Sequence, residues 1–170
     1  MKAISIFIKA ARLRQYLILI CAMSASIITG CGTTSTVMDP IDASEVQPYS
    51  VSVEYNVEVS DDWKYMFESK LDVQLSAARM KADQTDTVSN LAEITFITFR
   101  LRDDGTRLMA GIFAGTDEIT SNIVVRDSSG NVIGNGTVTT TNSSAWGSND
   151  GYLEDHARDI VKFLQGNSEP

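Results

Sequence analysis

The chain has 170 residues, of which 43% are apolar and 21% are charged. This length accommodates one globular domain, and the composition excludes a disordered or fibrous chain. Residues 1–30 contain four basic residues and no acidic ones, which leaves 10 basic against 22 acidic residues in the rest of the chain, a net charge of −12. Because phosphate backbones attract basic surfaces, this acidic balance disfavours a nucleic-acid partner.

Residues 1–30 have the order of a secretory signal peptide. A basic stretch ends at Arg14, a mostly apolar run continues to Ile28, and small residues then lead to Cys31. The uncharged run over residues 15–30 is shorter than the roughly 20 apolar residues that a membrane-spanning helix needs. The sequence therefore predicts a leader that is cleaved rather than a permanent transmembrane anchor.

The residues Ile28, Thr29, Gly30 and Cys31 resemble the lipobox of bacterial lipoproteins, with isoleucine where that motif usually has leucine. The resemblance implies cleavage between Gly30 and Cys31, a diacylglycerol on the Cys31 sulfur and a further acyl chain on its amino group. Two or more chains anchor a protein stably, because each buried CH₂ contributes about 0.8 kcal/mol. In such lipoproteins an aspartate directly after the cysteine tends to retain the protein in the inner membrane. Here that residue is Gly32, which favours the periplasmic face of the outer membrane. The alternative is an ordinary secretory signal with an incidental cysteine.

The segment that follows, residues 31–48, is rich in Thr, Ser, Asp and Pro and has no sustained periodicity. It predicts a flexible tether that begins with the lipidated cysteine. We expect a single folded domain over residues 49–166 and a frayed tail at residues 167–170.

The first two elements of this domain are a strand and a helix. Residues 49–60 alternate between apolar and polar side chains, which predicts a strand with one buried face. Ser60 or Asp61 is placed to cap a helix that continues to about Met80. Its apolar side chains recur at steps of three and four and form one stripe: Trp63, Phe67, Leu71, Leu75 and Ala78.

Three further strands and a second helix are expected in the rest of the domain. Residues 91–102 carry β-branched or aromatic side chains on both parities, which is typical of an interior strand. Residues 118–126 and 131–141 flank a turn sequence and predict a hairpin. An apolar stripe over residues 153–164 predicts the closing helix, and Gly166 is placed for a left-handed cap.

The predicted order is strand, helix, three strands, helix. This order indicates an α+β two-layer sandwich, in which a mostly antiparallel four-stranded sheet carries both helices on one face.

Three segments have a recognisable combination of features. Residues 104–115 are rich in glycine, residues 124–133 form an Asp-x-x-Gly hairpin, and residues 153–164 form the closing helix. In this combination the chain resembles the family called domain of unknown function 4410. The resemblance implies an envelope lipoprotein, and it implies no particular activity.

The glycine-rich loop is the best candidate for a binding site. Three glycines alternate there with apolar side chains, so the loop is either a docking element for a partner or ligand, or a strand connection that completes the core. No Gly-Lys-Ser/Thr follows, which excludes a phosphate cradle. The candidate binding residues are Gly105, Arg107, Leu108, Gly111, Ile112, Phe113 and Gly115.

The sequence offers no other chemistry. His156 is the only histidine and is flanked by acidic residues, so we expect a surface position rather than a metal ligand. We expect no cofactor, no metal and no enzymatic activity, because neither a nucleophile elbow nor a second histidine is present.

Three functions remain open from the sequence. The first is a non-catalytic lipoprotein of the cell envelope that is anchored through Cys31 and presented to a protein partner. The second is a binding module for a small or lipidic envelope ligand at the loop of residues 105–115. The third is an envelope hydrolase, which would need two carboxylates that converge in a cleft with raised pKa values.

Overall fold

The computed structural model describes residues 32–41, 49–82, 90–102, 115–142 and 148–166. All of them belong to the unit Cys31–Pro170. The elements follow in the order β1 (Gly32–Asp39), β2 (Tyr49–Tyr55), α2 (Asp61–Ala82), β3 (Asn90–Arg100), β4 (Asp117–Arg126), β5 (Val132–Asn142) and α4 (Asn149–Leu164). Within these residues, neither helix combines the length and apolarity that crossing a bilayer requires.

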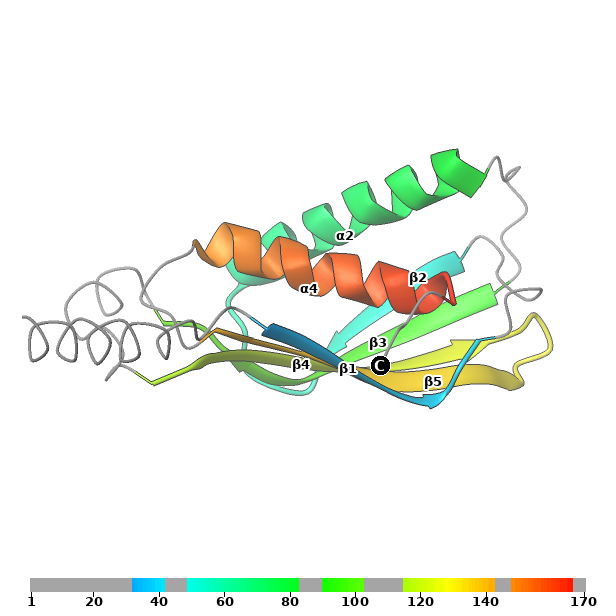
Figure 1. The fold of residues 1–170 in the computed structure, drawn as a ribbon, viewed down its shortest axis with the longest axis horizontal. Helices are drawn as coiled ribbons and strands as arrows, with labels where there is room; N and C mark the ends of the chain where they lie inside the picture. Colours follow the sequence, from blue (N-terminus) through cyan, green and yellow to red (C-terminus); the bar gives the residue numbers. More distant parts are fainter. Residues whose placement is uncertain (1–31, 42–48, 83–89, 103–114, 143–147, 167–170) are drawn as a thin grey trace, which may run out of the picture. The chain divides into compact units, whose positions relative to one another are not determined.

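The strands form one five-stranded sheet in the order β1-β5-β4-β3-β2. The pairs β1/β5, β5/β4 and β4/β3 are antiparallel, and β2 pairs with β3 in parallel. The parallel pair arises because helix α2 connects β2 to β3 and returns the chain to the same end of the sheet. Both helices cover one face of the sheet (Figure 1), which confirms the predicted α+β class with two layers.

The prediction of a mostly antiparallel sheet is confirmed for three of the four strand pairs, but the predicted number of four strands was wrong. Strand β1 lies inside the expected tether and pairs with β5 from Gly32 to Asp39. Its sequence lacks apolar alternation, but it is rich in threonine, and an edge strand is held by its backbone ladder as much as by a buried face. The parallel β2/β3 pair was also missed, because a strand, helix, strand order is compatible with either direction.

The other predicted elements are close to those observed. The alternation of the first strand is seen in the burial of β2, where Tyr49 is buried and the polar residues between the apolar ones are exposed. This strand ends at Tyr55 rather than near residue 60. Gly166 follows α4 with a φ of 67°, as the predicted left-handed cap requires.

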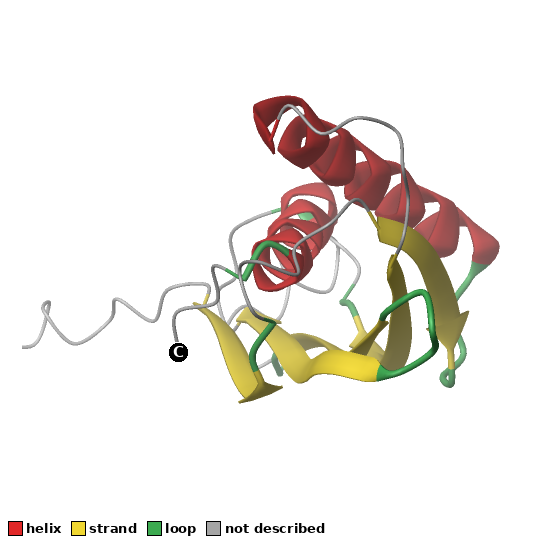
Figure 2. Ribbon diagram, turned by 90° about the vertical axis from the view of Figure 1, so that its right-hand side faces the viewer, coloured by secondary structure: helices red, strands yellow, loops and turns green. Residues whose placement is uncertain are grey.

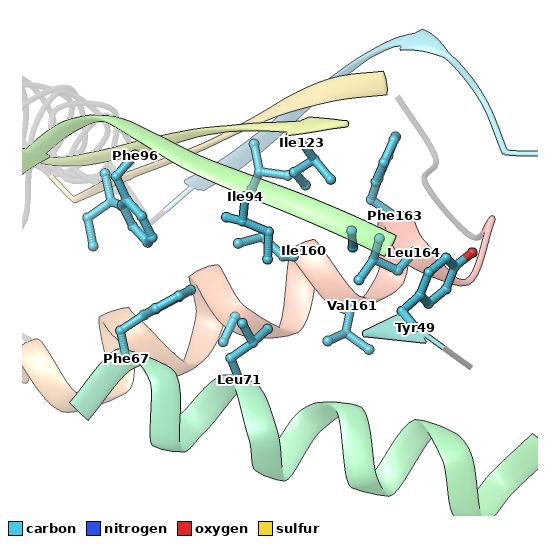
Figure 3. Close-up of a cluster of buried hydrophobic side chains, with 14 of the residues drawn as sticks. Tyr49, Phe67, Leu71, Ile94, Phe96, Ile123, Ile160, Val161, Phe163 and Leu164 are labelled. Atoms are coloured by element: carbon cyan, nitrogen blue, oxygen red, sulfur yellow. The ribbon is translucent and has the colours of Figure 1, made fainter. Parts of the chain in front are cut away.

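The core lies between the sheet and the two helices (Figures 2 and 3). Phe96 on β3 is its aromatic centre: its ring packs edge-on against Phe67 of α2 at 4.8 Å and stacks on Tyr55 of β2 at 4.8 Å. Helix α4 contributes most of its length to this core, and its first turn is capped by the Ser148 hydroxyl, which accepts from the amide of Gly151.

Gly136 allows α4 to approach the sheet closely. A Cβ at this position of β5 would lie 2.9 Å from Cε2 of Phe163 and 3.2 Å from the carbonyl oxygen of Thr36. The missing side chain therefore makes the space that the Phe163 ring occupies.

Candidate functional site

A histidine lies at the centre of the polar part of the core. His156 of α4 is fully buried, and its Nε2 lies 2.9 Å from Oγ of Ser121 while its Nδ1 lies 2.8 Å from Oγ1 of Thr140. Burial lowers the pKa of His156 to about 3, against a smaller raising effect of Asp159. The imidazole is therefore neutral at physiological pH, and each ring nitrogen has a hydroxyl partner.

The expected surface position of His156 was wrong. The residue lies three positions after Leu153 and four before Ile160, which places it on the buried stripe of the helix. The acidic neighbours that suggested exposure flank this stripe, where Asp155 pairs with Arg158 and Asp159 pairs with Lys162.

The pair of Ser121 and His156 has the composition of a nucleophile and its general base. Ser121, Thr140 and His156 are each completely buried, and the second nitrogen of the imidazole meets a hydroxyl rather than a carboxylate. A substrate has no access to this serine in the structure, so the arrangement satisfies buried polar groups and orients α4 on the sheet.

A buried ion pair joins the two ends of the candidate loop. The Arg102 guanidinium donates from Nε and Nη2 to the two carboxylate oxygens of Asp117, at 3.1 and 3.0 Å, and the Arg102 amide donates to the same carboxylate at 2.7 Å. The side chains are 6% and 0% exposed. The pKa of Arg102 is raised, chiefly by this hydrogen bonding.

Residues around this pair complete a polar network at one end of the sheet. Arg102 also donates to the carbonyl of Asn142, the Asn149 amide donates to the carbonyl of Arg102, and the Tyr152 hydroxyl donates to the carbonyls of Asp117 and Thr140. These hydrogen bonds connect the end of β3, the start of β4, the end of β5 and the first turn of α4.

The loop itself lies almost entirely outside the described residues. This applies to Gly105, Arg107, Leu108, Gly111, Ile112 and Phe113, while Gly115 is described, is exposed and has a φ of 89°. The candidate binding loop thus stays a prediction. Cys31 and Gly30 also lie outside the described residues.

An open cleft lies between β2 and α2. It has a volume of about 280 Å³ and is lined by four apolar side chains and two carboxylates: Val51, Val53, Leu71, Leu75, Glu68 and Asp72. The Tyr55 hydroxyl donates to Glu68 at 3.3 Å. Burial and the Glu68 carboxylate together raise the pKa of Tyr55. The sequence signal for this cleft was present, since the alternation of the strand and the stripe of the helix define its walls.

The outward face of α2 is uncharged from Tyr65 to Met80, and the exposed Asp62 lies in the same sector one turn earlier. Tyr65, Val73 and Met80 are 76%, 61% and 78% exposed, and the exposed residues Ser69 and Ser76 lie between them. At 100° per residue the five positions fall within roughly 80° of the helix circumference. We call these five residues the outer stripe of α2. Sequence reasoning missed it because only the apolar stripe facing the sheet was sought.

The described residues contain no group of three or more histidine, cysteine or acidic side chains arranged to hold a metal ion. The cleft and the outer stripe both lie on or beside α2.

The geometry defines an α+β sandwich with a mixed five-stranded sheet, and this class of fold occurs in a known assembly-forming protein. PelC from Paraburkholderia phytofirmans, solved as a dodecamer, matches with a TM-score of 0.51 at 13% sequence identity, and a single-residue variant of it matches with 0.50 at 14%. Each match covers 80% of this chain and 98% of the PelC chain. At this identity the likeness shows the fold alone. No family model and no curated protein matches the sequence.

Proposed function

We propose that this protein is a lipid-anchored, non-catalytic domain of the bacterial cell envelope that acts through contacts with protein partners, further copies of the same chain among them. The observation that carries the proposal is the outer stripe of α2, with three large apolar side chains more than half exposed. The part of this face from Tyr65 to Met80 carries no charge, so copies of a chain whose net charge after residue 30 is −12 would meet there with little repulsion. The dodecameric state of PelC supports self-association of this fold.

The proposed anchor is the lipid on Cys31, with the periplasmic face of the outer membrane as the favoured location. Strand β1 begins at Gly32, so a lipid on the preceding residue would hold the sheet next to the bilayer without the long spacer that the sequence suggested. Mass spectrometry of the mature protein tests the anchor. We expect an N-terminus at Cys31 with the mass of its acyl chains, and no such mass in a Cys31→Ala variant; an unlipidated N-terminus elsewhere would contradict it.

Self-association is tested on the full-length mature protein extracted in mild detergent. We expect light scattering after size exclusion to give a multimer, and a Val73→Lys variant to dissociate, since an ammonium group would be buried in the contact. The matched control is Val132→Lys on the β4/β5 hairpin, whose valine is 46% exposed and lies outside α2. A monomeric unmodified protein, or equal dissociation by both variants, would contradict the proposal. Circular dichroism of each variant distinguishes dissociation from unfolding.

A further inference from the structure

The backbone of β2 is paired with β3 on one side, and on the other side the groups of Val51 and Val53 face outward. The amide of Asn56 donates to the carbonyl of Phe96 at 3.1 Å, and Phe96 is the register partner of Tyr55. In a parallel pair, successive residues direct their N–H and C=O groups alternately toward the partner and away from it. Val51 and Val53 therefore direct theirs away from β3. Since β2 is the last strand of the described sheet, these groups face an open edge.

The side chains beside this edge form the cleft already described. Val51 and Val53 turn their half-buried side chains toward α2, where Leu71 and Leu75 form the opposite wall. Helix and strand enclose an apolar trough that runs along the unpaired backbone. A polypeptide added to this edge would place every second side chain in the trough.

Two carboxylates stand at the outer rim of the trough. Glu68 and Asp72 are exposed and one helical turn apart, about 6 Å along the axis. Side chains on one face of a strand repeat at about 6.6 Å, so two successive inward side chains of an added strand match the two carboxylates. Within the described residues, Asp72 has no cationic partner.

Lysine and arginine fit this trough better than other side chains. Their aliphatic stems cover apolar surface while their charged ends reach a polar rim, and here the stems would lie on the valines and leucines and the ends at Glu68 and Asp72. The trough is bounded at both ends. Arg79 closes one end by donating to the carbonyl of Tyr49 at 2.6 Å, and the Tyr55 hydroxyl closes the other on Glu68.

We propose that the cleft between β2 and α2 binds an extended segment of a partner protein that carries Lys or Arg at alternate positions and pairs with the free edge of β2. The inference rests on the proposed role in protein contacts, and it identifies a partner chemistry that the outer stripe of α2 does not share. An acidic second copy of this chain is a poor occupant, since the rim of the cleft is itself negative.

The first test measures binding of labelled synthetic peptides to the full-length mature protein in mild detergent at low salt. One eight-residue peptide alternates lysine with threonine, and a second has the same composition with its lysines consecutive. We expect the alternating peptide to bind with a dissociation constant below about 1 mM and the other at least severalfold more weakly. Equal binding of the two, or no binding at that concentration, would overturn the proposal.

Charge neutralisation then locates the site. A Glu68→Gln, Asp72→Asn double variant should bind the alternating peptide about tenfold more weakly, and the effect should shrink in 0.5 M salt, about a 4 Å Debye length. The control is Glu54→Gln on the same strand, whose side chain points to the face away from α2. An equal loss in the control would show nonspecific attraction and overturn the proposal.

Two forms of the peptide, one N-methylated at every lysine and one at every threonine, test strand pairing. Because alternate amides of a strand face the same edge, one form should lose binding and the other keep it. Equal binding of both would overturn strand addition. Dissociation of the multimer by the alternating peptide would show that a second copy occupies the cleft, and would also overturn the proposal. A protein that self-associates without binding peptide leaves the proposed function intact, whereas a monomer that binds it leaves this inference intact.

Discussion

The two helices cover the same face of one sheet but differ in how much of each is buried. Helix α4 buries nine of its 16 residues, including the only histidine of the chain. Helix α2 is longer, at 22 residues, yet of its described side chains only Phe67 and Leu71 are buried. A helix that the core needs is apolar where it meets the sheet and charged elsewhere. The outer stripe of α2 departs from that rule, so the α2 side of the molecule is where contacts with other molecules are expected.

The two sides also differ in their polar interactions. Beneath α4, polar groups are buried and matched: Arg102 with Asp117, and His156 with two hydroxyls. Beside α2, the carboxylates are exposed at the rim of an open cleft. Buried networks are costly to disturb, while exposed charges contribute little to stability and remain available for binding. Substitutions on the α4 side should therefore change folding, and substitutions on the α2 side should change binding.

The largest effect is expected at the buried ion pair. Arg102→Ala removes the guanidinium from the buried Asp117 carboxylate, which should lower the free energy of unfolding by about 3–5 kcal/mol. Urea denaturation followed by circular dichroism measures it. The matched control is Arg100→Ala, whose pair with Glu118 is exposed, 64% for the arginine side chain, and should cost less than about 1 kcal/mol. If both variants lose a similar free energy of unfolding, burial does not determine how much each ion pair contributes to stability.

A pH dependence should follow from His156. Its pKa is about 3 in the folded state and 6.5 in the unfolded state, so the unfolded chain takes up a proton first as the pH falls. Stability is then complete above about pH 6.5 and is lost progressively toward pH 3. Between pH 7 and pH 5 the free energy of unfolding should fall by about 2 kcal/mol. Because this is the only histidine, a His156→Gln variant should be less stable overall and flat over that interval; an unchanged slope in the variant would assign the titration to another group.

A smaller effect is expected where α4 meets β5. Gly136→Ala introduces a Cβ against the Phe163 ring and the Thr36 carbonyl, and overpacking of this kind costs about 1–2 kcal/mol. Thermal unfolding measures the loss. Gly151→Ala is the control, since a Cβ there meets only the Ser148 hydroxyl, at 3.4 Å, and alanine favours the helix. If Phe163→Leu restores the stability of Gly136→Ala, the ring contact is the cause; if it does not, the contact with the β1 backbone is.

Much of this organisation was predictable from periodicity. The β2 alternation, the α4 stripe and the β4/β5 hairpin follow from local patterns, which is why these elements were predicted, the hairpin strands within one residue of their observed bounds and the start of β2 at Tyr49. Strand β1 was not predicted, because the apolar side chains that periodicity detects are sparse in it and pairing with β5 is a long-range event. One member of the buried network could have been recognised in the sequence. Ser121 is a polar residue in phase with Ile119 and Ile123 on the buried face of β4.

The partners of the buried groups could not be read from the chain. Ser121 and His156 are 35 positions apart, and Arg102 and Asn149 are 47 apart, so their contacts depend on how α4 crosses the sheet. The lipidation of Cys31 and the binding loop of residues 105–115 lie outside the described residues and remain predictions. The sequence predicted the helix α2 that carries the cleft and the outer stripe. It did not show which face of this helix the core would leave exposed.

The smallest effect on stability is expected for a substitution in the outer stripe of α2. Such a substitution therefore tests most directly whether α2 and α4 differ in how the core uses them. Val73 is 61% exposed, so Val73→Ser removes little buried surface and should change the free energy of unfolding of the monomer by less than about 0.5 kcal/mol. Val161→Ser, on α4 and 5% exposed, is the matched control and should cost several times more, because it loses apolar contacts and buries a hydroxyl. Urea denaturation at low protein concentration measures both on the monomer. If Val73→Ser proves as costly as Val161→Ser, the stripe belongs to the folded core and the contrast between the two helices fails; if it is neutral for folding but weakens self-association, the valine is exposed for a partner.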